Sequence, residues 1–275
     1  MTSVTELRSA SSATRFLARR RAAKLSPELP EPVLGSFTDE QIGFAARAWT
    51  MRAQEEHQSA TIFAEALSLL VDAESSIDVL AVLTQIIADE LRHSEMCTDL
   101  ARRFDAGSPR RTALPRAEEA LTVDGRYRRG VRILLVEGAI GETISSALFN
   151  AGRNSAEEPC TKQALSRILR DEVLHARLFW EMLSTMRGAF DAGEMERLQQ
   201  DVTRALGAIE RVQMLPTLKR LERNEPFDPA WAALGVLPPE RRVDAFYGSL
   251  ERRVRPSLTR LGLDGDRAWE RRYRV

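Results

Sequence analysis

Two of the three histidines in this 275-residue sequence end the same motif, Asp-Glu-x-x-His. The two copies are Asp89, Glu90 and His93, and Asp171, Glu172 and His175. On an α-helix, residues three positions apart lie on one face, so the glutamate and the histidine of each copy point to the same place. A carboxylate and an imidazole arranged in this way are typical ligands of a transition metal. The sequence therefore predicts that both copies bind metal.

The two motifs fall in the second and fourth of four long segments with helical periodicity. Thr38 with Gln41 forms a capping-box pattern at the start of the first segment, and Pro159 stands at a first-turn position of the fourth. We expect helices from about residue 38 to 71, 76 to 104, 124 to 152 and 159 to 187, with a long crossover at about 105–123. Two helical hairpins joined by a crossover predict an all-α fold, a ferritin-like four-helix bundle.

Composition suggests three regions and excludes some partners. We interpret residues 37–188 as the bundle, 1–36 as a mobile N-terminal arm, and 189–275 as a C-terminal helical extension packed on the bundle. Forty basic residues balance forty acidic ones, which argues against a nucleic-acid partner. Cys97 and Cys160 form neither a Cys-x-x-Cys pair nor a disulfide framework, and no apolar run is long enough for a membrane span. These features predict a cytoplasmic protein that does not bind a membrane.

The first and third helices carry a related pattern, in which a glutamate is followed by serine at plus three and phenylalanine at plus seven. The pattern starts at Glu56 and at Glu142, which suggests that the two hairpins are copies of one unit. Counted from the turns, Glu56 reaches the level of Glu90, and Glu142 that of Glu172, at about 1.5 Å per residue. Glu137 is the alternative or additional ligand. Glu137 lies about 6 Å further from the turn than Glu172 does, and a bulge in the helix would remove this difference.

Over about residues 45–185, the sequence resembles the ferritin-like diiron carboxylate proteins. The resemblance implies six ligands from four helices, here Glu56, Glu90, His93, Glu142, Glu172 and His175. They would hold two iron ions, with a manganese–iron pair as the alternative, and O2 would be the co-substrate. In that family an aspartate before each motif glutamate orients the histidine of the opposite helix, which assigns Asp89 to His175 and Asp171 to His93. His57 lies about 100° around the helix from Glu56, so a hydrogen bond behind the ligands is its favoured role and direct ligation the alternative.

The resemblance also implies an activity, that of a diiron oxygenase or oxidase. Such an enzyme would hydroxylate, desaturate or N-oxygenate a small organic or carrier-bound substrate. Ile168 stands where the arylamine N-oxygenases of the superfamily carry an additional histidine, which weakens the case for N-oxygenation. Without a Cys-x-x-Cys rubredoxin module, electrons must come from an external donor. Ferroxidase or peroxide handling and tRNA-modifying hydroxylation are the alternative functions, and a homodimer is left open.

Overall fold

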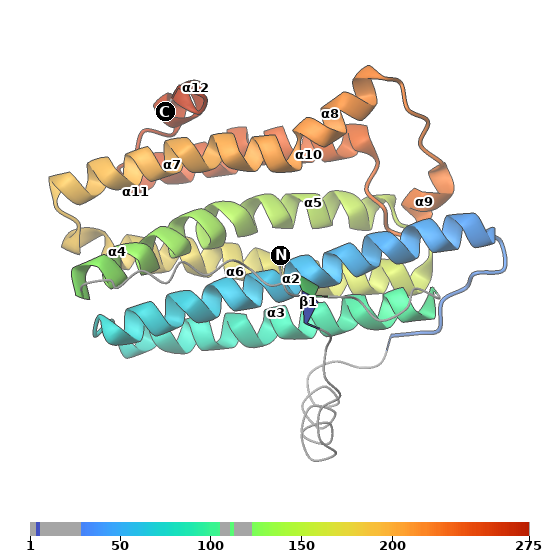
Figure 1. Ribbon diagram of the computed structural model, residues 1–275, viewed down its shortest axis with the longest axis horizontal. Coiled ribbons are helices and arrows are strands. Elements are labelled where there is room, and N and C mark those ends of the chain that lie inside the picture. The colour runs from blue at the N-terminus through green and yellow to red at the C-terminus, as the bar shows by residue number, and fades with distance from the viewer. Residues whose placement is uncertain (1–3, 6–28, 105–110, 113–122, 275) are drawn as a thin grey trace, which may run out of the picture.

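The computed structural model describes residues 4–5, 29–104, 111–112 and 123–274 (Figure 1). Within these residues the chain is almost entirely helical, and the only strands are the two-residue segments β1, Val4–Thr5, and β2, Arg111–Thr112, which pair antiparallel. The predicted all-α class is confirmed. Most of the predicted arm and of the crossover lies outside the described residues. Of the arm, residues 29–36 are described, and the Val33 N–H there donates to Glu158 Oε1 at 3.1 Å.

Helices α2, Asp39–Asp72, and α3, Ile77–Arg103, form the first hairpin of the bundle. The predicted capping box is present: Thr38 Oγ1 accepts from the Gln41 N–H, and Gln41 Oε1 accepts from the Thr38 N–H. Between the two helices the chain turns through Glu74, whose φ of 55° lies in the left-handed region. In Figure 1 the two helices run side by side, and their boundaries agree closely with those expected from the sequence.

The second hairpin pairs α6, Pro159–Met186, with a third bundle helix that is not regular throughout. The third helix consists of α4, Val123–Ile133, the π-helical segment η1, Leu134–Gly141, and α5, Glu142–Ser155. The sequence predicted one regular helix here, with a bulge only as an exception. Gly138 in η1 lies directly against α6, since a Cβ at this position would be 2.4 Å from the Phe179 ring. Close helix contact therefore explains a glycine that is otherwise unfavourable inside a helix.

The C-terminal residues form further helices, as the fold class predicted. They are η2, Arg187–Ala189, α7, Ala192–Gln213, α8, Leu215–Glu222, α9, Pro229–Ala233, α10, Pro239–Ser249, η3, Leu250–Val254, α11, Arg255–Leu261, and α12, Gly265–Arg271. Helices α7 and α10 make a layer above α5 in Figure 1, and both contact the third bundle helix, α10 at α5 and α7 at η1. None of the described helices combines the length and the apolar character needed to cross a membrane.

The interior of the bundle contains two separate apolar clusters. The first, which we call the Phe63 cluster, includes Phe63, Ile86, Leu134 and Phe179. The second, the Trp49 cluster, includes Trp49, Cys97, Phe149 and Ile168. Each cluster takes side chains from α2, α3, α6 and the third bundle helix. On α2, α3 and α6, buried polar residues stand between the members of the two clusters, and they belong to the candidate site.

Candidate metal centre

Six buried polar side chains occupy the layer between the two apolar clusters. They are Glu56 of α2, Glu90 and His93 of α3, Glu142 of α5, and Glu172 and His175 of α6. None of the six is more than 6% exposed. Ionised carboxylates are rarely buried to this extent unless they are paired or bind a metal ion. The structure thus brings together the six residues that the sequence put forward as ligands.

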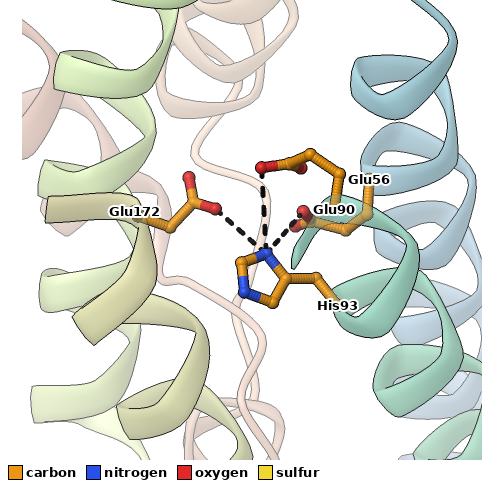
Figure 2. A group of neighbouring side chains, drawn as sticks. All are labelled: Glu56, Glu90, His93 and Glu172. Carbon is orange, nitrogen blue, oxygen red and sulfur yellow. Dashed lines mark ion pairs between the residues drawn. The ribbon is translucent and has the colours of Figure 1, made fainter. Parts of the chain in front are cut away.

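Three of these carboxylates, those of Glu56, Glu90 and Glu172, lie around the imidazole of His93 (Figure 2). His93 Nδ1 lies 3.2 Å from Glu172 Oε1, 3.5 Å from Glu56 Oε2 and 4.0 Å from Glu90 Oε1. Figure 2 shows that Glu172 approaches from one side of the ring, and Glu56 and Glu90 from the other. One ligand atom from each of the four residues lies within 4.8 Å of the others, so a single cation could contact all four.

A second group of the same kind lies beside the first and surrounds His175. His175 Nδ1 is 3.0 Å from Glu90 Oε1, 3.9 Å from Glu142 Oε2 and 4.0 Å from Glu172 Oε1. The ligand atoms of this group also lie within 4.8 Å of one another. Glu90 and Glu172 belong to both groups. The arrangement is therefore two adjacent ligand sets that share two carboxylates, one set around each histidine.

Several atoms of the two groups are buried without a hydrogen-bond partner in the described part of the chain. They are Glu90 Oε1, His93 Nδ1, Glu142 Oε2, Glu172 Oε1 and His175 Nδ1. A buried polar atom without a partner costs about 1–3 kcal/mol, and more if it is charged. Five such atoms that face the same small volume are the feature expected where cations take the place of hydrogen bonds. The side chains present therefore fit a pair of metal ions.

Without a cation, two of the carboxylates, those of Glu90 and Glu142, hold a proton more tightly than usual. Burial and the charge of Glu172 raise the pKa of Glu90 to about 8, and the same two causes raise the pKa of Glu142 well above its ordinary value. Burial alone would lower the pKa of His175, but Asp89 and Glu90 raise it to about 9. Four carboxylates with two neutral imidazoles carry a charge of −4, which two divalent cations neutralise.

The far side of each imidazole faces an aspartate on the opposite helix, as the family resemblance implied. His93 Nε2 is 3.3 Å from Asp171 Oδ2, and His175 Nε2 is 3.3 Å from Asp89 Oδ2. A proton held on Nε2 by the aspartate leaves the lone pair of Nδ1 directed at the carboxylates, which is the tautomer that binds metal. Asp89 and Asp171 thereby orient the two histidines.

Arg92 joins these two aspartates, a role that the sequence analysis did not assign. Its Nη1 donates to Asp89 Oδ1 at 2.7 Å and its Nη2 to Asp171 Oδ2 at 2.8 Å. Its positive charge helps to hold the pKa of both aspartates below the usual range, against the effect of burial. The only sequence signal was its place inside the first motif, where it lies three residues after Asp89 and hence on the same helix face.

Two other candidate residues lie outside both ligand groups. Glu137, the alternative to Glu142, is exposed in η1 and belongs to neither group, whereas Glu142 is 4% exposed. His57 is half-buried and likewise absent from both groups. The structure places Ile168, at the position of the additional histidine in arylamine N-oxygenases, in the Trp49 cluster with no exposed surface. The ligand groups thus take one residue from each of α2 and α5 and two from each of α3 and α6.

No family model matches the chain, and a search of curated proteins found no significant match.

A surface hollow of about 70 Å³ between α4 and α7, with Tyr127 and Glu194 among its walls, shares no residue with the candidate metal centre. Oxygen and imidazole donors together are typical ligands of divalent transition metals.

Proposed function

We propose that this chain is a ferritin-like diiron oxidoreductase that uses O2 to oxidise a small organic or carrier-bound molecule. The observation that carries the proposal is the pair of overlapping ligand groups that share Glu90 and Glu172. A single-metal site would need only one such group. Two adjacent groups of carboxylate and imidazole, inside a four-helix bundle, are the arrangement used by proteins that bind two iron or manganese ions.

The ligand groups suggest how the metals would be held. Glu56 and His93 would serve one ion, Glu142 and His175 the other, with Glu90 and Glu172 between them. Two reduced iron ions bound there would supply the electrons that activate O2 for attack on an organic substrate. Reduction of the pair would use an external electron donor, since Cys97 and Cys160 form no Cys-x-x-Cys pair.

The protein's own contribution is orientation and the exclusion of water. The salt bridges of Arg92 to Asp89 and Asp171 fix the direction of both imidazoles before metal binds. The Phe63 and Trp49 clusters enclose the polar layer from both ends of the bundle. A low-polarity surrounding strengthens the attraction between carboxylates and cations and protects reactive species from side reactions.

The proposal is tested by loading purified metal-free protein with Fe(II) under anaerobic conditions. Metal analysis gives the stoichiometry, and stopped-flow absorbance follows the reaction after mixing with O2. We expect two iron ions per chain and a transient visible absorbance band. Rapid oxidation that leaves mineralised iron would instead indicate a ferroxidase, and failure to bind iron would refute the proposal.

A matched pair of variants makes the test specific to the site. Glu172→Gln removes a carboxylate common to both ligand groups, and we expect it to lower iron binding at both positions. Glu181→Gln makes the same substitution two and a half turns later on α6, at an exposed glutamate that pairs with Arg177. The control variant should bind iron as the wild type does.

A further inference from the structure

An arginine lies one helical turn from the candidate metal centre, in an unusual environment. Arg52 precedes Glu56 by four residues, which is about 6 Å along the α2 axis. Its Cζ lies 4.4 Å from the ring centroid of Trp49 and 5.4 Å from that of Phe149. Nη2 donates to Gly235 O at 3.4 Å. Nη1 is buried and has no hydrogen-bond partner within the described residues. The guanidinium therefore has a buried N–H donor, on Nη1, without a hydrogen-bond partner.

Arg242, on α10, adds a second positive charge near the first. It is half-buried, and burial lowers its pKa, while the charge of Glu55 raises it and that of Arg52 lowers it further. The charge of Glu55 acts on both arginines. Two half-buried guanidinium groups thus share the influence of one nearby carboxylate. An uncompensated buried charge is costly, and a bound anion would remove that cost.

The face of α5 that carries Glu142 leads from the metal centre toward Arg52. Ser146 and Phe149 follow Glu142 by four and seven residues, so all three lie on one face of the helix. Ser146 is 3% exposed, and its Oγ has no partner among the described residues. The Phe149 ring contacts the Arg52 guanidinium. A polar atom without a partner and an apolar ring are suitable surroundings for an organic molecule that extends from the metal centre to Arg52.

We propose that Arg52, with Arg242 adding positive charge to its surroundings, binds a carboxylate group of the organic substrate and so holds its oxidisable part at the metal centre. This inference rests on the proposed function. Arginine presents a planar fork of N–H donors that matches a carboxylate, and Nη1 of Arg52 is available for such a bond. The substrate class is accordingly a small organic acid with an apolar body.

The test is isothermal titration of the full-length, metal-free protein with sodium benzoate, octanoate and indole-3-acetate. Benzamide and octanamide serve as uncharged probes of the same shape, and inorganic phosphate as an anion without an organic part. We expect at least one carboxylate to bind and its amide to bind about tenfold or more weakly, because a charge-assisted hydrogen bond is lost. Phosphate that binds as tightly as any of the carboxylates would overturn the assignment to organic acids.

Variants decide whether the two arginines are responsible. Arg52→Gln and Arg242→Gln should each weaken carboxylate binding about tenfold or more. Arg47→Gln is the matched control, since Arg47 also lies on α2 and over an aromatic ring, that of Phe44 at 5.6 Å, but is exposed. Arg242→Gln, on another helix, keeps the test valid if Arg52→Gln does not fold.

Two results would overturn the inference: no carboxylate binds the wild type, or binding is unchanged in both variants. Iron stoichiometry is measured in parallel, because neither arginine belongs to a ligand group. Loss of carboxylate binding with two irons retained supports the anion site. Carboxylate binding that depends on Arg52, in a protein that takes up no iron when Fe(II) is offered, would keep the anion site and remove its link to oxidation, which separates the two proposals.

Discussion

Raising the pH from about 5 to about 9 should destabilise the metal-free protein. Burial and Glu172 raise the pKa of Glu90 from 4.5 to about 8, and Asp89 and Glu90 raise that of His175, against burial, from 6.5 to about 9. Each group binds its proton more tightly in the folded chain than in the unfolded chain. The stabilisation is complete below the unfolded pKa and disappears as the pH rises through the folded one.

The size of the loss of stability follows from the difference between the folded and unfolded pKa values of each group. For Glu90, 8 − 4.5 is 3.5 pH units, or about 5 kcal/mol at about 1.4 kcal/mol per unit. For His175, 9 − 6.5 is 2.5 units, or about 3 kcal/mol. The two side chains lie 3.0 Å apart, so the losses are not additive. We expect the free energy of unfolding to fall by about 3–5 kcal/mol across this range. The lowered pKa values of Asp89 and Asp171 act only at more acidic pH.

Urea unfolding of the metal-free protein, followed by circular dichroism at several pH values, measures this loss. Glu90→Gln removes the titrating carboxylate and should flatten the dependence, whereas Glu181→Gln, at an exposed site on α6, should leave it unchanged. Anaerobic Fe(II) should stabilise the wild type more at high pH, because the ligands must be deprotonated to bind. Stability that stays level or rises from about pH 5 to 9 would refute the electrostatic account of the site.

Three further predictions concern single side chains. His175→Ala should lower the iron content and abolish reaction with O2 while helicity remains largely intact, as metal analysis and circular dichroism will measure. Glu142→Gln should reduce the iron stoichiometry, and Glu137→Gln should not, because only Glu142 belongs to a ligand group. Arg92→Gln should weaken metal binding about 10–100-fold without removing a ligand, because the aspartates then lose the cation between them.

Each of these has an outcome that would contradict it. Full iron content in His175→Ala would show that the imidazole is not a ligand. A larger loss in Glu137→Gln than in Glu142→Gln would move the fourth carboxylate to the exposed position. For Arg92, the control is Arg177→Gln, which breaks an exposed pair with Glu181. Equal metal affinities of these two variants would mean that Arg92 does not act through the aspartates.

The sequence was a good guide where periodicity and spacing decide the structure. Helix boundaries followed from the capping box at Thr38 and from Pro159 at the start of α6. The pairing of Glu56 with Glu90 in height followed from equal distances to the turn, because rise per residue is constant in a helix. Such arguments need only local geometry, which one sequence contains.

Features that depend on contacts between distant segments could not be predicted in the same way. The sequence allowed for a bulge in the third bundle helix but did not predict the π-helical segment η1. The structure places η1 where Gly138 lies against Phe179 of α6. The salt bridge from Arg92 to Asp171 joins residues 79 positions apart, and the free donor of Arg52 depends on the position of Phe149. No pattern of neighbouring residues indicates which of these distant segments contact one another.

The division of the core into the Phe63 and Trp49 clusters has a consequence for the order of folding. Each cluster already joins all four bundle helices, so either one can close the bundle without the other. The polar layer between them then becomes the least stable part of a metal-free bundle. Amide hydrogens of α3 and α6 beside the ligands should exchange with solvent sooner than those within either cluster. Iron would then bind to a chain that is already folded and link the first hairpin, α2 and α3, to α5 and α6 of the second.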